Sequence, residues 1–443
     1  MKVYLDTVGC RLNQAEIEQY AKQFRAAGHT LVASAAQADL VVVNTCAVTS
    51  AAASDSRGKI RQAARKGAGQ VVATGCWSTL NPATAAALPG VSRVVLNPDK
   101  DHLVSVVLDL PQEIFEQEPL EREPVPGARL RTRAFIKVQD GCDNRCTFCV
   151  TTVARGAGRS VPLELVLQDI RSALHEDGED PSGAQEIVLT GVHLGSWGQD
   201  LSPSLRLHDL VQAILVETNT PRLRLSSLEP WDLDEEFFAL WQDSRLCRHL
   251  HLPLQSGSAA TLRRMARKTT PQSFADLVAA ARKAIPGVAI TTDLIAGFPG
   301  ESQAEFQETL EFVSAMHFAG GHVFTYSARP GTAAARMPKQ VPHALRKERN
   351  AALRQALEAA SQRYSAGFVG QVLPVLWESA TGLGPQGWEL SGLSDNYLRI
   401  SAHAPRQLWN QITPVRLIKL EPGRLQGAII QGPDEGQRPF QAT

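Results

Sequence analysis

The chain lacks several features that would assign it to a specialised class of protein. It has 443 residues but only seven cysteines, an odd count at low density that argues against a disulfide framework and favours metal or redox chemistry. No uninterrupted apolar run approaches the roughly 20 residues that span a bilayer. The opening segment, MKVYLDTVGC, has no apolar core of a secretory signal. We therefore expect a cytoplasmic protein with no membrane partner.

An excess of charge of one sign is also missing, because 45 lysines and arginines balance 45 aspartates and glutamates. Overall charge gives no argument for a nucleic-acid partner, so any such surface must be local. Each basic cluster taken alone is more often a solvated helix face than an RNA contact. The clusters are Arg57, Lys59, Arg61, Arg65 and Lys66; Arg129, Arg131, Arg133 and Lys137; Arg155 and Arg159; and Arg263, Arg264, Arg267 and Lys268.

Three of the cysteines, Cys142, Cys146 and Cys149, stand close together with the spacing C-x3-C-x2-C and no fourth cysteine nearby. A structural zinc ion takes four protein ligands, and an electron-transfer [4Fe-4S] cluster usually takes four cysteines. A run of three thiols therefore favours a cluster with one iron open to a substrate. Two alternatives stay open: a zinc site completed by a distant ligand, and three small buried residues.

The residues before this run read as a strand over 135–139, which Asp140-Gly141 interrupts just ahead of the first cysteine. The thiols are thus predicted to lie in a loop at the carboxyl end of a strand. Parallel α/β barrels place their chemistry at such loops. Phe148, beside the last cysteine, would add an apolar wall to the pocket.

The pattern along the chain predicts an α/β protein of several domains, for which a hydrophobic content of 43% is ample. Short β-rich runs alternate with amphipathic stretches in the first hundred residues, as in a parallel sheet with crossover helices. Six further strand signals between 134 and 327 suit a partial (β/α)6 barrel. A long helix over 342–368 is followed by strand signals alone, which predict a small antiparallel β-barrel.

These patterns give domain boundaries and strand positions. We expect an N-terminal domain over 1–112, a linker rich in Pro, Glu and Arg over 113–131, the partial barrel over 132–363 and the small β-barrel over 364–432. The expected strands are 2–6, 30–33, 40–44, 70–74 and 93–96; then 135–139, 186–190, 222–226, 249–254, 290–295 and 322–326; and finally 371–378, 388–393, 398–401, 414–420 and 425–430.

Three more cysteines, Cys10, Cys46 and Cys76, each follow the end of a predicted N-terminal strand. Such ends lie on one edge of a parallel sheet, so the thiols are expected to converge and to form a second metal centre. The alternative is three unrelated buried cysteines. Gly9 and Gly75 would let the backbone turn tightly at two of them.

The chain as a whole resembles the radical S-adenosylmethionine (SAM) methylthiotransferases. The resemblance rests on the cysteine run above and on Thr7 to Gln14, Asn44 to Thr49 and Ala73 to Cys76. It implies an N-terminal methylthiotransferase domain, a radical-SAM barrel and a C-terminal TRAM domain. It also implies two [4Fe-4S] clusters: Cys142, Cys146 and Cys149 would hold the one that binds SAM, and Cys10, Cys46 and Cys76 an auxiliary cluster that supplies sulfur.

Further matching segments of the family run over 224–230, 251–258 and 293–301. They imply SAM contacts, although strand-end side chains bonded to the backbone are an equally good reading. The candidates are Phe148, Glu229, Gln255, Ser256, Ile295 and Gly297. One departure concerns Val150 to Gly156, where relatives more often carry a proline and an aromatic residue, and it leaves the shape of the substrate-facing loop open. Cys247 matches no motif and is expected to be buried.

The substrate is a matter of resemblance alone. The N-terminal segments look most like the branch that methylthiolates C2 of N6-threonylcarbamoyladenosine (t6A) at position 37, in the anticodon loop of tRNA, using two SAM. Two sister branches stay open, which act on isopentenyladenosine in tRNA or on an aspartate of a ribosomal protein. A non-enzymatic RNA-binding iron-sulfur protein is the remaining alternative. The resemblance implies an electron donor such as flavodoxin or ferredoxin and leaves the sulfur donor unknown.

Overall fold

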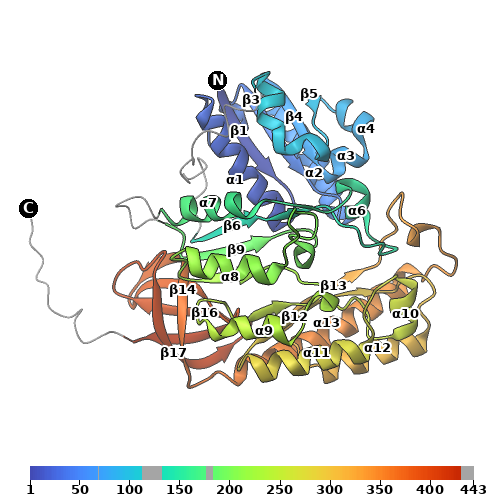
Figure 1. Ribbon diagram of the computed structural model, residues 1–443, viewed down its shortest axis with the longest axis vertical. Coiled ribbons are helices and arrows are strands. Elements are labelled where there is room, and N and C mark those ends of the chain that lie inside the picture. The colour runs from blue at the N-terminus through green and yellow to red at the C-terminus, as the bar shows by residue number, and fades with distance from the viewer. Residues whose placement is uncertain (68, 112–131, 176–182, 431–443) are drawn as a thin grey trace, which may run out of the picture.

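The computed structural model describes residues 1–67, 69–111, 132–175 and 183–430, and the expected linker lies outside these ranges. Three units follow one another along the chain: a parallel sheet, a partial barrel of parallel strands and a small closed barrel (Figure 1). This order confirms the predicted fold class. No helix in the described ranges combines the length and apolar character needed to cross a membrane.

The N-terminal unit is a five-stranded parallel sheet in the order β2-β1-β3-β4-β5. Its strands are β1 (Lys2–Thr7), β2 (Thr30–Leu31), β3 (Leu40–Thr45), β4 (Gln70–Gly75) and β5 (Val91–Val94). Its helices are α1 (Arg11–Ala26), α2 (Ser50–Arg65), α3 (Cys76–Leu80), α4 (Pro82–Ala86) and α5 (Leu103–Leu108). All of β3 is buried, as expected for a central strand covered on both faces. Ile17, Tyr20 and Phe24 recur at helical spacing along α1 and pack against the sheet.

The order of these strands reverses between β1 and β3, so the crossovers leave the sheet in opposite directions from that point. In open α/β sheets, ligands bind outside the carboxyl ends of the strands at this topological switch point. Cys10 follows β1 and Cys46 follows β3. The sheet therefore offers a binding crevice where two of the predicted thiol ligands stand.

The central unit is a row of six parallel strands, β6-β9-β10 and β11-β12-β13, which isolated bridges join at Leu223 to Leu246 and at Ser227 to His251. The strands are β6 (Arg133–Lys137), β9 (Glu186–Thr190), β10 (Leu223–Leu225), β11 (His249–His251), β12 (Ala289–Ala296) and β13 (Gly320–Thr325). The helices are α6 (Val150–Arg155), α7 (Leu163–Leu174), α8 (Leu207–Glu217), α9 (Glu235–Phe238), α10 (Ala259–Arg264), α11 (Pro271–Ala284) and α12 (Gln303–Ala315). A two-stranded ribbon, β7 (Gln139–Asp140) with β8 (Arg159–Ser160), brackets the cysteine run.

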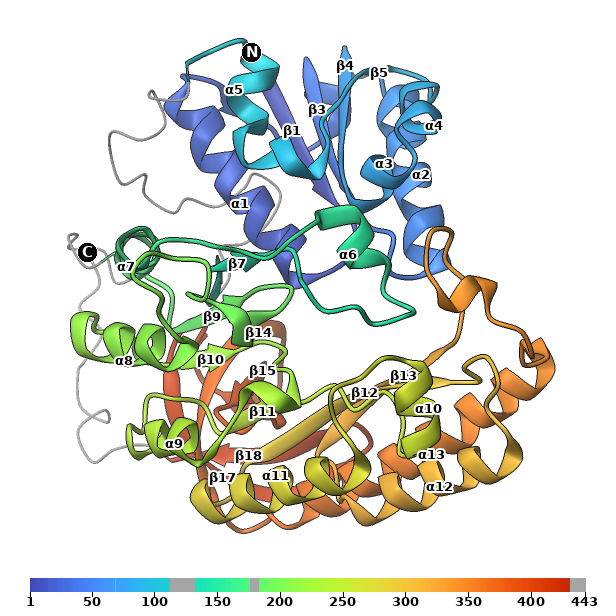
Figure 2. The same ribbon diagram turned by 45° about the vertical axis from the view of Figure 1, so that its right-hand side comes forward.

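Helix α1 also contacts the first strands of this partial barrel (Figure 2). Ala134 and Ile136 of β6 belong to the main core, whereas Phe135 points the other way. Phe135 and Val188 form a separate small cluster with Ala15 of α1. Because side chains alternate across a strand, the N-terminal unit packs on the face of the barrel strands that is turned away from the main core.

Helix α13 (His343–Ala366) leads into the closed barrel β14-β15-β16-β18-β17. Its strands are β14 (Val372–Gly384), β15 (Gly387–Ser394), β16 (Arg399–Ala404), β17 (Ile412–Glu421) and β18 (Arg424–Ile429). The pairing of β16 with β18 is parallel and the other pairings are antiparallel. The sequence pattern predicted an antiparallel barrel throughout and could not show this one exception, since strand direction depends on how the chain closes.

The small barrel contacts residues at the amino ends of the central strands. Arg224 of β10 forms a two-bond ion pair with Glu186 at the start of β9, at 2.6 and 3.0 Å, and donates to the Asp395 carbonyl at 3.0 Å. Tyr397 stacks on His249 at the start of β11, with ring centroids 4.1 Å apart. These contacts occupy the amino ends of the strands, so the carboxyl ends remain for the chemistry.

Candidate active site

The first set of cysteines lies in the loop between β7 and α6, at the carboxyl end of the first barrel strand. Cys149 is the N-cap residue, directly ahead of the first residue of α6, Val150. Gly141, just ahead of Cys142, has φ of +73°, and a Cβ there would lie 1.8 Å from the Ala157 carbonyl oxygen. Only glycine fits this position, so the entry to the loop is fixed by the backbone.

Each thiol of this loop accepts a hydrogen bond. The Asn144 backbone N–H donates to Cys142 Sγ at 3.4 Å, and the Thr152 hydroxyl donates to Cys149 Sγ at 3.5 Å. Arg267 Nη1 lies 3.8 Å from Cys146 Sγ. Donors aimed at sulfur suit thiolates that carry negative charge, as metal-bound cysteines do.

The second set of cysteines stands at the carboxyl ends of the neighbouring strands β1, β3 and β4. A Cβ at Gly9 would lie 2.6 Å from Cys46 Sγ, and the backbone of Gly75 has φ of +88°. A side chain at Gly9 would collide with Cys46, and one at Gly75 would collide with Asn44 Oδ1 and the Thr45 backbone, so both turns require glycine. Burial, together with the neighbouring Cys10 and Cys76, raises the pKa of Cys46 to about 11, although a backbone hydrogen bond from Val48 and the charge of Arg155 lower it. The sheet therefore brings the three thiols close enough to interact electrostatically.

The donor chemistry of both sets fits iron-sulfur clusters. All seven cysteines are free thiols. Cys76 Sγ accepts from Arg155 Nε at 3.3 Å and from Asn97 Nδ2 at 3.7 Å. Each thiolate of a [4Fe-4S] cluster binds a different iron, so the three need not converge on one point. Among the described residues, no three His, Cys, Asp or Glu side chains surround a position for a single metal ion.

Two of the candidate SAM contacts are apolar and lie together. Phe148 and Ile295 pack against the same small core of Met265, Phe298, Tyr326 and Ala334. Phe148 meets Phe298 edge to face, with ring centroids 6.4 Å apart. The cysteine loop and the end of β12 thus share one apolar wall.

The polar candidates are already engaged within the protein. Glu229 pairs with Arg267 at 3.1 and 2.6 Å, and the Ser256 hydroxyl lies 3.0 Å from the Thr309 hydroxyl. Gln255 has φ of +73° and is held by backbone bonds to β12. At Gly297, a Cβ would lie 2.2 Å from Arg346 Cγ. A role for these four residues in binding SAM stays a prediction, as it does for Phe148 and Ile295.

His193 was not identified from the sequence and lies beside the first set of cysteines. Its Nε2 lies 2.6 Å from Asp232 Oδ2. Burial would lower the pKa of His193, but hydrogen bonds to Asp232 and to Cys142 raise it to about 10. The sequence could have indicated His193 by its position just after β9, at the carboxyl end of a barrel strand, where such barrels place functional residues. Cys247, by contrast, is buried as expected.

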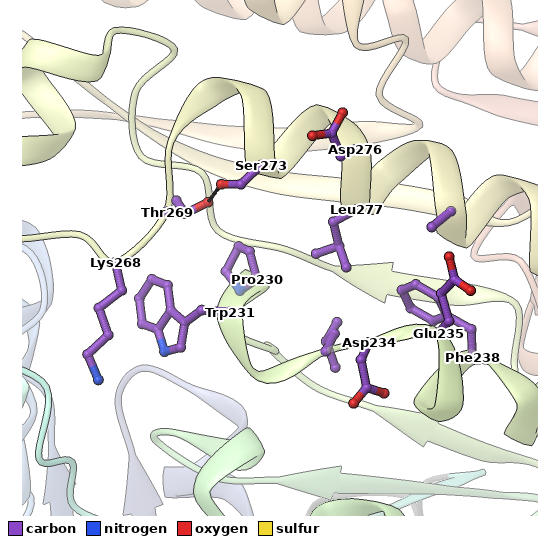
Figure 3. A pocket seen from close by; sticks show the side chains of 12 residues that line it. Pro230, Trp231, Asp234, Glu235, Phe238, Lys268, Thr269, Ser273, Asp276 and Leu277 are labelled. Atoms are coloured by element: carbon purple, nitrogen blue, oxygen red, sulfur yellow. Dashed lines mark hydrogen bonds between the residues drawn. The ribbon is translucent and has the colours of Figure 1, made fainter.

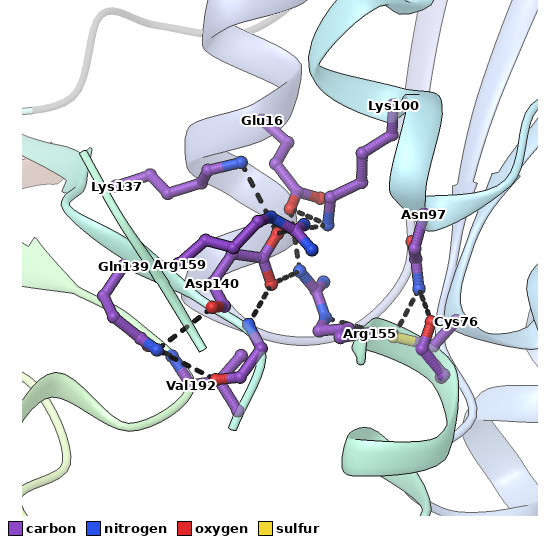
Figure 4. Close-up of polar contacts among 12 residues, drawn as sticks. Glu16, Cys76, Asn97, Lys100, Lys137, Gln139, Asp140, Arg155, Arg159 and Val192 are labelled. Carbon is purple, nitrogen blue, oxygen red and sulfur yellow. Dashed lines mark hydrogen bonds and ion pairs between the residues drawn. The ribbon is translucent and has the colours of Figure 1, made fainter. Parts of the chain in front are cut away.

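A network of buried charges extends from Cys76 of the second set to Asp140, two residues ahead of the first set (Figure 4). Arg155, at the end of α6, contacts Cys76, Glu16 and Asp140. Arg155 and Arg267 are 2% and 8% exposed, so neither can belong to an open basic surface as their place in the sequence clusters suggested.

A groove of about 430 Å³ lies between α9 and α11, away from the cysteines (Figure 3). Trp231, Asp234, Lys268 and Asp276 are among its lining residues, and none of the six cysteines is. Lys268 Nζ stands 5.8 Å from the Trp231 ring centroid. We assign no part of the chemistry to this groove.

Comparison with known proteins agrees with this arrangement. Residues 2–97 match the uncharacterized protein family UPF0004, and residues 136–313 match the radical SAM superfamily. A solved structure of the radical SAM methyltransferase TsrM from Kitasatospora setae, with cobalamin and a [4Fe-4S] cluster bound, aligns with TM-score 0.54 and 15% identity. It covers 75% of this chain and 77% of its own, which supports the fold alone.

Three curated relatives match over nearly the whole chain. Two are named threonylcarbamoyladenosine tRNA methylthiotransferase MtaB: that of Bacillus subtilis is 34% identical over 94% of both chains, and that of Thermotoga maritima 37% identical over 90% of both. The third, a tRNA-2-methylthio-N(6)-dimethylallyladenosine synthase of Moorella thermoacetica, is 30% identical over 96% of this chain and 98% of its own. This chain belongs to the radical SAM methylthiotransferase family.

Proposed function

We propose that this enzyme methylthiolates C2 of t6A at position 37 of tRNA, using SAM and two [4Fe-4S] clusters. The observation that carries the proposal is the presence of three cysteines at carboxyl ends of strands in each of two neighbouring domains, with Arg155 bonded both to Cys76 and to Asp140, two residues ahead of Cys142. The t6A substrate follows from the relatives named MtaB, which are 34% and 37% identical to this chain, against 30% for the dimethylallyladenosine synthase.

Cys142, Cys146 and Cys149 would hold the cluster that binds SAM, and Cys10, Cys46 and Cys76 the auxiliary cluster. When bound, the two groups supply the radical that activates an inert C–H bond and the sulfur that is inserted there. The chain's own part is to position and shield these groups. Phe148 and Ile295 supply an apolar wall beside the cysteine loop, and the Arg267 guanidinium places positive charge beside the Cys146 thiolate.

Gln255 fits a positioning role within this site. Its φ of +73° is unusual for a residue with a side chain. Its N–H donates to the Asp293 carbonyl at 2.8 Å, and its carbonyl accepts from Ile295 N–H at 2.9 Å. These two hydrogen bonds hold Gln255, which comes after β11, beside the carboxyl-terminal part of β12. We propose that this turn presents Gln255 and Ser256 to SAM.

The small closed barrel is proposed to be a TRAM domain that assists in binding the tRNA, and the electron donor to be a flavodoxin or ferredoxin. We place the reaction in the cytoplasm, where tRNA is processed. C2 of the adenine is reachable only when the base is unstacked, which an anticodon loop permits more readily than a duplex.

The decisive experiment compares tRNA nucleosides from a strain lacking this gene with those from the parent by mass spectrometry. Loss of 2-methylthio-t6A with the unmodified t6A retained supports the proposal. Persistence of the methylthio group on t6A, together with its loss from dimethylallyladenosine or from a ribosomal-protein aspartate, would assign the enzyme to a sister branch. Purified enzyme that forms no 5′-deoxyadenosine from SAM and dithionite after anaerobic reconstitution would exclude radical chemistry altogether.

A further inference from the structure

Arg155 stands where the two cysteine sites meet. It is the last residue of α6, and Cys149 is the N-cap residue of the same helix. Its Nη1 donates to Asp140 Oδ1 at 2.8 Å, and Asp140 is two residues ahead of Cys142. The Arg155 side chain therefore connects Asp140, ahead of the cysteine loop, to α6, which follows the loop.

The same side chain reaches across to the N-terminal domain (Figure 4). Its Nε donates to Cys76 Sγ at 3.3 Å, its Nη1 also donates to Glu16 Oε1 at 3.0 Å, and its Nη2 donates to Asn13 Oδ1 at 3.0 Å. The same Asn13 Oδ1 also lies 3.6 Å from Cys10 Sγ. Arg155 thus contacts one thiol of the second site directly and another through a single amide.

The surroundings keep Arg155 charged although it is only 2% exposed. Burial by itself would lower the pKa of Arg155, but Glu16, Cys76 and Asp140 raise it well above its usual value. Lys100 is fully buried as well and pairs with the same two carboxylates, with 3.1 Å from its Nζ to Asp140 Oδ2. The two carboxylates therefore offset the charges of the two buried cations. Of these cations, Arg155 is the one that donates to a cysteine sulfur, through its Nε.

We propose that Arg155 is a positioning residue that raises the reduction potential of the auxiliary cluster by donating a charge-assisted hydrogen bond to Cys76. Its bonds to Asp140 and Glu16 fix that donor relative to the loop of the first cluster. The inference rests on the proposed function, because it requires a cluster at Cys10, Cys46 and Cys76.

The physical reason is electrostatic. Reduction adds an electron to the cluster and its sulfur ligands, and a cationic donor at a ligand sulfur stabilises the added charge. The effect is strong where water is excluded, since the low dielectric leaves the interaction unscreened. A donor that only held the domains together would leave the potential unchanged.

The test uses the full chain with Cys142, Cys146 and Cys149 changed to alanine, so that iron bound after anaerobic reconstitution reports the second site alone. In this parent, the midpoint potential is measured by a redox titration followed by electron paramagnetic resonance. Arg155→Gln is expected to favour the oxidised cluster at least tenfold, a shift of 59 mV to lower potential for one electron. Lys100→Gln is the matched control, because it removes a buried cation from the same carboxylates and is expected to shift the potential much less.

Arg155→Gln could fail to fold, because it leaves Glu16 and Asp140 short of a cation. The double variant Arg155→Gln/Glu16→Gln removes one charge of each sign, and its reference is the single variant Glu16→Gln. The same tenfold difference is expected between these two proteins. Equal potentials with and without Arg155, or an equal shift from Lys100→Gln, would overturn the role of Arg155. A parent that binds no iron would instead overturn the auxiliary cluster, and with it both proposals.

Discussion

The two cysteine sites differ in what holds them. Cys142 and Cys149 receive hydrogen bonds from residues of the same short segment, Asn144 in the loop and Thr152 in α6. The second site has ligands on three separate strands, and the strongest donor to it, Arg155, comes from the other domain. The first site can thus be organised within its own segment, whereas the second depends on how the two domains dock. Changes at the interface should therefore damage the second site more than the first.

Removing one thiol from each site gives the largest expected contrast. Cys142→Ala should abolish both 5′-deoxyadenosine formation and the methylthiolated nucleoside, because the first site would lose a ligand. Cys76→Ala should abolish the methylthiolated nucleoside while 5′-deoxyadenosine still forms. Chromatography of the reaction mixture measures both products. If Cys76→Ala also stopped the formation of 5′-deoxyadenosine, the two sites would not be separable as described.

Breaking the buried charge network should come next in size. Glu16→Ala leaves Arg155 and Lys100 without a carboxylate that both contact, and breaking a buried pair in this way typically costs about 3–5 kcal/mol. Urea unfolding of the iron-free chain measures the change. Lys59→Ala is the control, since its pair with Asp6 is partly exposed and should contribute about 0–1 kcal/mol. Similar losses for both variants would contradict a special role for the network.

The same network predicts a pH dependence of stability. Burial would raise the pKa of Glu16, but Arg155, Lys100 and Lys137 lower it to about 2, while Asp140 opposes them. A carboxyl whose folded pKa is lowered stabilises the protein above its unfolded pKa of 4.5, and this contribution is lost as the pH falls toward 2. The unfolding free energy of the iron-free chain should therefore decrease as the pH is lowered from about 5 to about 2. Glu16→Gln should flatten this slope, and an unchanged slope would show that other carboxyls cause it.

The smallest expected effect concerns the first site. Arg267→Lys keeps the charge near Cys146 but loses the two-bond pair with Glu229. The rate of 5′-deoxyadenosine formation should fall about tenfold, as is typical when a residue supporting a metal ligand is changed. Arg264→Lys is matched, because Arg264 makes the same kind of pair with Glu305 at 2.9 and 2.7 Å without contacting a cysteine. Equal rates in the two variants would remove Arg267 from the site.

Much of the fold could be predicted because local patterns specify it. The five N-terminal strands, the six barrel strands and the long helix α13 all lie within a few residues of their expected places. Their ends differ where tertiary contacts decide. The predicted strand 135–139, for example, is divided into β6 and β7, and the Gln139 amide caps the following loop by donating to the Gly141 carbonyl at 2.9 Å.

The sequence also determined the chemistry of the first site. The spacing of Cys142, Cys146 and Cys149 fixes three thiols in one loop whatever surrounds it, and the resemblance to the family followed from such local segments. For the second site, the rule that parallel strands share a carboxyl edge was enough to associate Cys10, Cys46 and Cys76.

Only the tertiary structure decided which charges serve the site. In the sequence, Arg155 and Arg267 look like members of basic surface clusters, yet each is buried against a carboxylate and a thiol. The role of a charged side chain depends on whether water or a specific partner surrounds it, because desolvation is costly unless a partner of opposite charge compensates. For Arg155 that compensation comes partly from Asp140 in the same domain and partly from Glu16, which lies 139 residues away in the N-terminal domain. The spacing of residues in the sequence does not indicate the pair with Glu16, because only the docking of the two domains creates it.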